Sequence, residues 1–290
     1  MKDDPIVFLH VGAPKTGSTF LQKNVFPCWP NMKYKNELWL SYLVLMEEGK
    51  KYIISNENLF GRPWNRDHAS GLSWSCERRL IFKSIGRLYP QAQTMVCFRK
   101  HSEFILSLYK QYLHEGGTTK LENFFDIYDD MGIIKRDDIM YMNIIDLLGD
   151  FFQNKPFVFT LSEIRNNFSG LIKKVAVLFD EAAPDLENMA SHVINEGVKY
   201  WQGKLLRILN IIDKKPGTSL KPNGLLKLTN NFTTRFRINP RILCQERLKG
   251  LPNRNIVFEK NVAETINGYY LGDWKAVQEY IAHNWAGLGG

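Results

Sequence analysis

The sequence lacks long hydrophobic runs. No window of about 18 residues is both apolar and uncharged, so we expect no membrane-spanning helix. The N-terminus also lacks the basic start and the extended apolar run of a secretory signal. Together, these absences argue against an integral membrane protein and predict a chain that stays in the cytoplasm.

Cysteine is scarce as well. The four cysteines, Cys28, Cys76, Cys97 and Cys244, are scattered, and no two of them have the spacing of metal ligands. A disulfide framework is not expected at this size and cysteine content, so we predict reduced thiols, with Cys97 inside an apolar strand. No Ser/His/Asp or Cys/His order indicates a hydrolase, and no internal repeat is present.

Positive charge is in excess, but it is confined to one segment. The net charge is +8, and residues 196–254 carry 13 Lys and Arg against 3 Asp and Glu, which leaves the rest of the chain slightly negative. Such a segment favours an anionic partner, for example an acidic glycan, a nucleotide, nucleic acid or an anionic membrane. The alternative is a solvated helical surface.

Short apolar runs alternate with helical patterns over the first 180 residues. Buried strands are predicted at residues 6–12, 52–57, 93–99 and 156–161, and more weakly at 255–259. Helical patterns occupy residues 18–26, 37–48, 76–89, 102–115, 138–152 and 170–179. This alternation predicts an α/β fold in which helices cover both faces of a central parallel sheet. Ligands of such sheets bind at the carboxyl ends of the strands.

The pattern becomes mainly helical from about residue 181. Helices are predicted at residues 199–213 and 262–284, and the stretch between them is broken by proline and glycine. We expect one domain, in which residues 1–180 form the ligand-binding α/β core. Residues 181–290 would form a basic, mainly helical part on the side of a second substrate or over the site.

The loop GAPKTGST, residues 12–19, follows the first predicted strand and opens a helix. Gly12 and Gly17 allow the chain to curl around an anion, and the N–H groups at a helix start carry partial positive charge. The triphosphatase pattern G-x-x-x-x-G-K-[ST] has a lysine where this loop has Ser18. Lys15 lies in the middle of the loop instead. The sequence therefore predicts a phosphate cradle of a different kind.

The segment PKTGSTFLQ, residues 14–22, resembles the 5′-phosphosulfate loop of sulfotransferases that use 3′-phosphoadenosine 5′-phosphosulfate (PAPS), particularly bacterial carbohydrate-type members. The resemblance covers about the first 180 residues and implies a fold like that of P-loop nucleotide kinases, with no metal. Lys15 would contact the oxygen of the leaving group. The loop residues implied to bind PAPS are Pro14, Lys15, Thr16, Gly17, Ser18 and Thr19.

A second element of the resemblance is an arginine at a strand end with a serine eight residues later. The segment CFRKHSEFILS supplies Arg99 and Ser107 at this spacing. In the family these two residues hold the 3′-phosphate, and the planar guanidinium suits a phosphate monoester. The resemblance therefore implies that Arg99 and Ser107 bind the 3′-phosphate of PAPS.

The acceptor hydroxyl must lose a proton to a base at the same edge of the sheet. Glu57 follows a predicted strand and resembles the strand-end S-x-E segment of bacterial sulfotransferases, so we predict that Glu57 is the base. A turn-capping role for this carboxylate is the alternative. His68, in a loop that could border the acceptor, is the leading rival base, and His114 is another.

The resemblance implies a carbohydrate acceptor in a capsule, lipopolysaccharide or other glycan. His68, Lys214 and Lys215 are weaker candidates for the acceptor side, and no nucleic acid is expected. A bacterial cytoplasmic enzyme could also associate with the inner face of the membrane. The rival classes are a P-loop kinase or NTPase with a degenerate loop, and a nucleic-acid-binding protein. The stretch GYYLGDWK, residues 268–275, only partly matches the C-terminal motif of cytosolic sulfotransferases, and we interpret it as coincidence within a helix.

Overall fold

The computed structural model describes residues 4–36, 46–64, 73–185, 200–212, 256–285 and 287. The chain divides into two compact units. The first comprises Met1–Phe104, Arg136–Val193 and Ile266–Gly290, and the second comprises Ile105–Lys135 and Ile194–Thr265. Each unit is therefore assembled from segments that are distant in the sequence.

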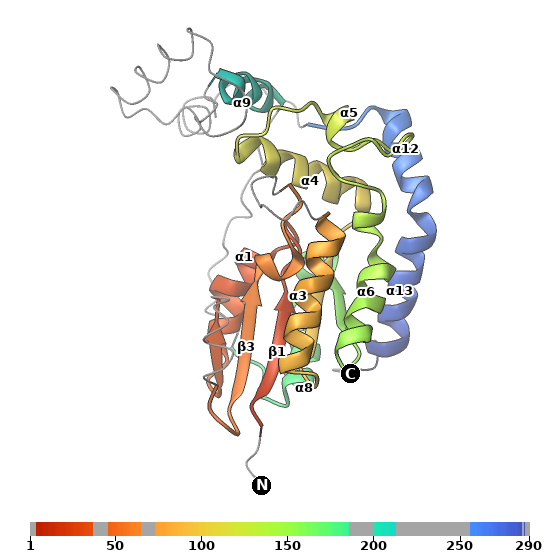
Figure 1. Cartoon of the computed structure of the whole chain (residues 1–290). Helices are drawn as coiled ribbons and strands as arrows, with labels where there is room; N and C mark the ends of the chain where they lie inside the picture. The colour runs from red at the N-terminus through yellow and green to blue at the C-terminus, as the bar shows by residue number, and fades with distance from the viewer. Residues whose placement is uncertain are drawn as a thin grey trace, which may run out of the picture. The chain divides into compact units, whose positions relative to one another are not determined.

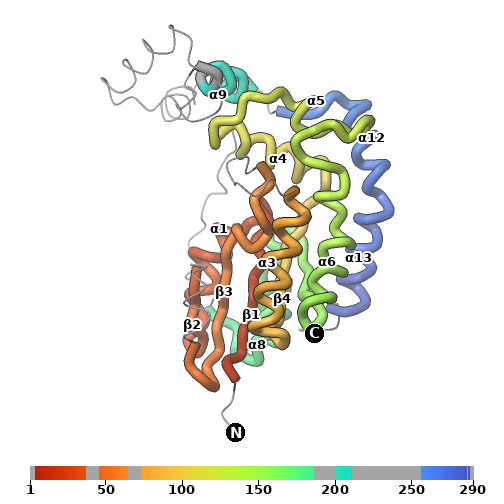
Figure 2. Tube along the Cα trace, in the orientation of Figure 1, coloured from red at the N-terminus to blue at the C-terminus, as the bar shows by residue number. Residues whose placement is uncertain are grey.

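The first unit contains a five-stranded sheet in which every neighbouring pair of strands is parallel. The central strands are buried along nearly their whole length, which explains their continuous apolar sequences. The predicted α/β class is confirmed (Figures 1 and 2). The strands, in the spatial order β2-β3-β1-β4-β5, are β1 (Ile6–Val11), β2 (Met32–Lys35), β3 (Lys51–Asn56), β4 (Gln93–Phe98) and β5 (Phe157–Thr160).

Helices cover both faces of this sheet. On one face, a core that includes Phe8, Ile53 and Cys97 packs against a helical segment after β1 and against α8 (Phe168–Phe179). The segment after β1 is α1 (Ser18–Phe20), the π-helix η1 (Leu21–Val25) and the 3₁₀-helix η2 (Phe26–Cys28). On the other face lie α3 (Trp74–Leu88) and α6 (Tyr141–Phe151), and α13 (Leu271–Trp285) packs against α6 and β5 (Figure 1).

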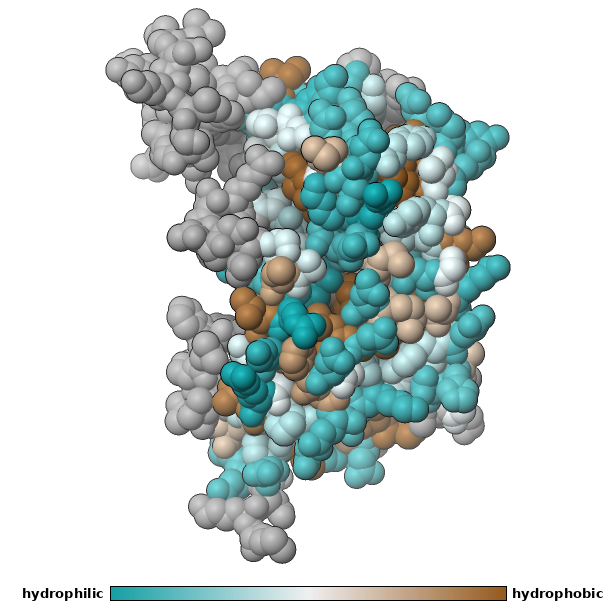
Figure 3. All heavy atoms as spheres, turned by 45° about the vertical axis from the view of Figure 1, so that its right-hand side comes forward, coloured by the Kyte–Doolittle hydropathy of each residue, from teal (hydrophilic) through white to brown (hydrophobic). Residues whose placement is uncertain are grey.

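The amphipathic pattern of α3 shows why these segments form covering helices. Its buried residues Trp74, Arg78, Phe82 and Ile85 recur every three or four residues, so that they form one stripe along the helix. Figure 3 shows one face of the molecule, where hydrophilic side chains predominate and apolar ones occur in small groups. Within the described ranges, no helix is long and apolar enough to span a bilayer.

The chain that follows β1 and the chain that follows β4 run on opposite faces of the sheet. The helical segment after β1 packs in the core that also contains α8, whereas the chain after β4 leads to α6 on the other face. Because β1 and β4 are adjacent, their carboxyl ends form the switch point where ligands of open α/β sheets bind. The loop at residues 12–17 and Arg99 both lie at this point.

Two strand predictions were wrong. Strand β2 (Met32–Lys35) was missed, because its sequence MKYK is short, half polar and lies at the edge of the sheet. The strand predicted at residues 255–259 is absent from the part that the structure describes, since residues 256–259 form no strand and lead directly into α12 (Lys260–Tyr269).

The predicted helices at residues 18–26, 76–89, 102–115, 138–152 and 170–179 are present with shifted ends, and of the helix predicted at 199–213 the described residues 200–212 are helical. Of the helix predicted at residues 37–48, residues 37–45 lie outside the described part of the chain. The helix predicted at 262–284 is two helices, because α12 ends at Tyr269 and α13 begins at Leu271. The remaining elements of the first unit are η3 (Glu57–Phe60), η4 (Asp137–Ile139) and α7 (Leu161–Asn166).

The second unit contains most of α4 (His101–His114), together with α5 (Leu121–Phe124), α9 (Tyr200–Ile212) and the first part of α12. Its core includes Phe124 and Leu206, both fully buried. The side chain of Asn210 donates hydrogen bonds to the carbonyl oxygens of Leu113 (2.8 Å) and Gly117 (2.9 Å), which ties α9 to the C-terminal end of α4.

Candidate functional site

The loop after β1 has a backbone shaped to surround an anion. Lys15 and Gly17 both have left-handed backbones, with φ of 61° and 92°. Such a backbone is uncommon for a residue other than glycine and is less stable for lysine by roughly 1 kcal/mol. Turns of this kind direct successive N–H groups to one side and form concavities for anions. Helix α1 begins directly after Gly17, so its unpaired N–H groups face the same region.

Two hydroxyl groups hold the inside of this loop. Thr16 Oγ1 donates to the carbonyl oxygen of Ala13 at 2.7 Å, and Ser18 Oγ donates to the same oxygen at 3.2 Å. Thr16 and Ser18 are buried, while Lys15 is exposed. The loop is therefore braced from within and presents its lysine outward. Of the other predicted loop residues, Pro14 is buried and Thr19 is exposed.

Gly12 brings the loop against Glu57. A Cβ atom on Gly12 would lie 3.1 Å from Ser18 Oγ and 3.4 Å from the Cα atom of Glu57, which is tight at both points. The sheet register explains this proximity, because Val11 pairs with Asn56, and Glu57 follows at the same level. The structure thus brings the predicted base, a partly exposed residue at the start of η3, beside the loop.

Gly17 packs the other side of the loop against the segment after β5. A Cβ atom here would lie 3.1 Å from Ile164 Cδ1 and 3.3 Å from Leu161 Cδ1, both in α7. The left-handed backbone alone already favours glycine at this position. The segments that follow β1, β3 and β5 therefore meet at one edge of the sheet.

Arg99 follows β4 at this edge. Its side chain is 20% exposed, and Nε lies 3.0 Å from Glu103 Oε2, one helical turn further on. Nε uses one of the five N–H donors of the guanidinium, so the geometry of this pair suits a second anion on the other nitrogens. Ser107 lies in α4 and is partly buried; it belongs to the second unit.

His10 lies beneath the loop in the core. It is fully buried, its Nδ1 lies 2.7 Å from Ser55 Oγ, and Gln22 Nε2 donates to the same hydroxyl at 3.1 Å. Burial lowers the pKa of His10 to about 3, so the ring is neutral. His10 is therefore a packed core residue. It joins β1 to β3, and through Ser55 to η1.

The described cysteines carry no disulfide. Cys28 and Cys76 are exposed, and Cys97 is buried in β4 as predicted. Burial raises the pKa of the Cys97 thiol well above its usual value, and the nearby hydroxyl of Thr16 opposes this only in part. Cys97 is therefore a neutral part of the floor under the loop. The described residues also contain no group of three or more His, Cys, Asp or Glu that could hold a metal ion.

Several predicted residues lie outside the described part of the chain: His68, Lys214, Lys215 and all of residues 213–254 in the basic segment. Of the rival histidines, His114 is exposed at the C-terminal end of α4. The roles assigned to these residues stay predictions.

Sequence reasoning missed one polar pair near Arg99. His101, at the start of α4, lies 3.0 Å through Nε2 from Asp273 Oδ2, and both side chains are buried. Asp273 belongs to the GDWK stretch and lies in the first turn of α13. The only local signal is an acidic residue in the first turn of α13, because 172 residues separate it from its partner.

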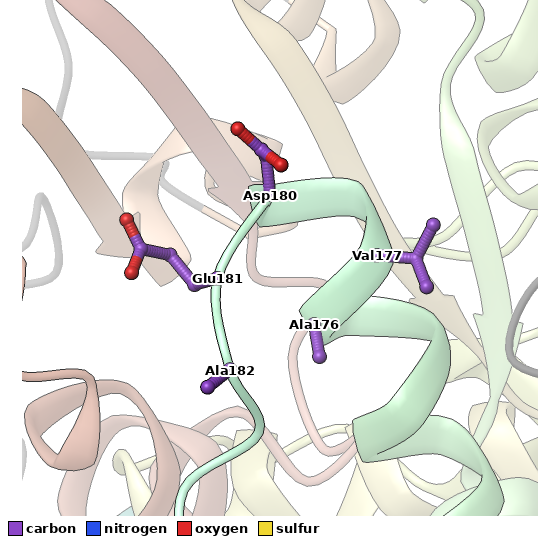
Figure 4. A pocket seen from close by; sticks show the side chains of 5 residues that line it. All are labelled: Ala176, Val177, Asp180, Glu181 and Ala182. Atoms are coloured by element: carbon purple, nitrogen blue, oxygen red, sulfur yellow. The ribbon is translucent and has the colours of Figure 1, made fainter.

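A shallow hollow of about 510 Å³ lies at the opposite edge of the sheet (Figure 4). Its lining residues are Ala176, Val177, Asp180, Glu181 and Ala182, at the C-terminal end of α8. Lys51, the first residue of β3, reaches this end and donates to the carbonyl oxygens of Phe179 and Asp180. The hollow therefore lies at the amino-terminal edge, away from the loop, and its carboxylate Glu181 is paired with Lys51 at 2.8 Å.

The fold and the loop edge define an α/β protein with a candidate anion site at the carboxyl ends of β1 and β4. No protein-family model and no curated protein matches the chain. Among solved structures, the chain is similar to a sulfotransferase from Alicyclobacillus acidocaldarius, with 12% identity over 88% of this chain and 97% of that chain, and a TM-score of 0.37. A similarity of this size does not assign a function, which must come from the residues of the loop edge.

Proposed function

We propose that this protein is a sulfotransferase that moves a sulfonyl group from PAPS to a hydroxyl group of an acceptor. One observation carries the proposal: Gly12 places the partly exposed Glu57 directly beside a loop that has an exposed, left-handed Lys15. An anion cradle and a glutamate thus lie at the same edge of the sheet. This is what transfer from an anionic donor to a hydroxyl requires.

The reaction is an in-line displacement at sulfur. The acceptor oxygen forms a bond to sulfur while the bond between sulfur and the 5′-phosphate oxygen breaks. Glu57 takes the proton of the acceptor hydroxyl, and 3′-phosphoadenosine 5′-phosphate (PAP) leaves. Lys15 and the backbone N–H groups at residues 16–19 stabilise the charge that develops on the leaving oxygen. The 5′-phosphate stays in the loop throughout.

The 3′-phosphate binds to Arg99 and Ser107. Arg99 lies at the switch point next to the loop, where its guanidinium can contact a phosphate while Nε remains paired with Glu103. Ser107 adds a hydroxyl donor from α4. A donor with two separate phosphates explains why a loop without the triphosphatase lysine is accompanied by an arginine on the neighbouring strand.

The acceptor is a carbohydrate hydroxyl in a capsule, lipopolysaccharide or similar glycan. The basic segment at residues 196–254 supports an anionic acceptor, with His68, Lys214 and Lys215 on the acceptor side. The enzyme works in the bacterial cytoplasm, with peripheral association at the inner face of the membrane. No metal takes part, because Lys15 and the loop supply the positive charge.

Calorimetric titration with PAP in the presence of EDTA tests this proposal. The wild-type protein should bind PAP, and Arg99→Ala should weaken binding by roughly 10- to 100-fold, because a charge-assisted contact to the 3′-phosphate is lost. Lys100→Ala, a change of the neighbouring exposed basic residue, is the matched control and should bind normally. Tighter binding of ATP with Mg²⁺ than of PAP would indicate a kinase or NTPase instead.

A further inference from the structure

A buried cluster lies directly behind Arg99 and is separate from the loop. Its centre is the pair His101 and Asp273, whose side chains are 2% and 1% exposed. Asp273 Oδ2 also accepts from the backbone N–H of Tyr141 at 2.9 Å, and Oδ1 accepts from that of Met142 at 2.9 Å. The carboxylate therefore connects the start of α13 with the starts of α4 and α6.

These hydrogen bonds keep Asp273 ionised. Burial acts to raise the pKa of Asp273, but the hydrogen bonds from His101 and from the two backbone amides outweigh it, so the pKa lies below its usual value. A carboxylate at a helix N-terminus is also favoured by the dipole of α6. Asp273 is thus a fixed, charged anchor for the elements around Arg99.

The ring of His101 is held between two tyrosines. It stacks on Tyr141 with a centroid distance of 4.1 Å and on Tyr270 with a distance of 4.2 Å, at interplanar angles of 25° and 5°. The edge of Trp274 closes a third side at 6.1 Å. Rings therefore pack against three sides of the imidazole and restrain His101, two residues after Arg99.

The two tyrosine hydroxyls bind different carbonyl groups. Tyr141 Oη donates to the carbonyl oxygen of Arg99 at 2.6 Å, whereas Tyr270 Oη donates to that of Arg136 at 2.9 Å. Burial, with Asp273 nearby, raises the pKa of Tyr141 well above its usual value, so its hydroxyl stays protonated and remains a donor. Tyr141 also stacks on Phe98, the residue before Arg99, at 4.2 Å.

We propose that Asp273, His101 and Tyr141 are positioning residues that hold the backbone of Arg99, so that its guanidinium meets the 3′-phosphate of the nucleotide without rearrangement. Arg99 is constrained from both sides, by Phe98 in β4 and by His101 in α4, and its carbonyl oxygen is held by Tyr141. Ordering of a long side chain opposes binding, and a backbone fixed in advance reduces this penalty. This inference rests on the proposed function, in which Arg99 binds the 3′-phosphate.

The two tyrosines provide a matched test. Tyr141→Phe and Tyr270→Phe each keep the stacked ring and remove one hydroxyl, but only the first hydroxyl binds Arg99. Affinities are measured by calorimetry for PAP and for adenosine 5′-monophosphate, which lacks the 3′-phosphate. Tyr141→Phe should weaken the affinity for PAP by roughly three- to tenfold, the effect of one hydrogen bond, and leave the affinity for the monophosphate unchanged. Tyr270→Phe should change neither affinity.

If Tyr141 only stabilised the fold, Tyr141→Phe would weaken the binding of both nucleotides alike. The ratio of PAP affinity to adenosine 5′-monophosphate affinity, measured within one variant, is therefore insensitive to a general loss of stability. In the Arg99→Ala background, Tyr141→Phe should have no further effect on PAP binding. Asp273→Asn is the variant to use if Tyr141→Phe does not fold. It should also lower the ratio of PAP affinity to adenosine 5′-monophosphate affinity.

The outcomes distinguish the two proposals. If wild-type protein binds PAP and Arg99→Ala weakens it, but Tyr141→Phe and Tyr270→Phe give equal ratios, the positioning role is wrong and the proposed function stands. If wild-type protein does not bind PAP without metal, the proposed function is wrong, and the positioning role is wrong with it.

Discussion

The two edges of the sheet use similar residues in opposite ways. At the amino-terminal edge, Lys51 donates to the carbonyl oxygens of Phe179 and Asp180 and to Glu181 Oε1, all within 2.9 Å. The ammonium group of Lys51 is therefore paired at the C-terminal end of α8. At the carboxyl-terminal edge, Lys15 is exposed beside a helix start. A lysine at a helix C-terminus stabilises the fold, whereas a lysine at a helix N-terminus adds to positive potential and favours an anion.

The loop edge also carries conformational strain that the other edge avoids. Lys15 has a left-handed backbone within the loop, while at the far edge the left-handed residue other than glycine is Asp180, the C-cap of α8, where such a backbone is common. Strain that serves no cap is a feature of ligand sites. The difference between the two edges is what directs the functional proposal to the loop.

The largest expected effect is on the proposed base. Glu57→Gln should lower the rate of sulfonyl transfer by about 10²- to 10⁴-fold, because the amide cannot accept the proton of the acceptor. PAP affinity should not change. The measurement is transfer of label from PAPS to a glycan acceptor, with Asp150→Asn on the exposed surface of α6 as the control. Turnover retained in Glu57→Gln would transfer the role of base to another residue.

Lys15→Ala should reduce transfer by about 10²- to 10³-fold, since it removes charge stabilisation at the leaving oxygen. Because Lys15 is exposed and alanine adopts the same left-handed backbone no more easily than lysine does, the melting temperature should stay the same. Lys23→Ala, another exposed lysine eight residues further on, is the control. A normal rate of transfer in Lys15→Ala would contradict the claim that Lys15, unlike Lys51, acts on a ligand.

Acid should destabilise the protein through His10. Its pKa is about 3 in the folded chain and about 6.5 when unfolded, so the unfolded state binds more protons between these values. Stability is therefore present above pH 6.5 and is lost as the pH falls. The loss should be about 1.4 kcal/mol per pH unit, or roughly 2 kcal/mol between pH 6.5 and 5.

Urea unfolding at several pH values measures this slope. His10→Gln should make the free energy of unfolding depend less steeply on pH, because one titrating histidine is removed. His283→Gln, at an exposed position in α13, should leave this pH dependence unchanged. Equal slopes for wild type and His10→Gln would show that His10 is not the neutral, buried group described above.

The smallest effect is expected at the other edge. Lys51→Met removes the donor that caps α8 and should lower the free energy of unfolding by about 1 kcal/mol, or the melting temperature by roughly 2–4 °C. PAP binding and transfer should be unaffected. Lys50→Met, at the exposed neighbouring position, should change neither quantity. Weaker PAP binding in Lys51→Met would mean that the two edges are not independent.

The sequence predicts much of the fold because the buried strands leave a strong local signal. The runs at β1, β3, β4 and β5 are apolar on both faces, and each predicted boundary lies within one residue of the observed one. In the edge strand β2, half of the residues are polar, so its sequence carries no such signal. The proximity of Glu57 to the loop also follows, since parallel strands end at the same edge.

The cluster behind Arg99 could not be predicted in the same way. His101 and Asp273 are 172 residues apart and are brought together by the packing of α13 against α6 and β5, so no local pattern links them. The break between α12 and α13 was missed for a related reason. Tyr270 lies between two helical patterns that read as one, and its burial against His101 is a tertiary contact.

Hydrogen–deuterium exchange with and without PAP tests the central claim most directly, because it compares both edges in one experiment. We expect PAP, in the presence of EDTA, to slow exchange in residues 12–22 and 98–104 and to leave residues 50–53 and 176–182 unchanged. Protection at the amino-terminal edge, or no protection at the loop, would contradict the assignment of the loop edge as the donor site.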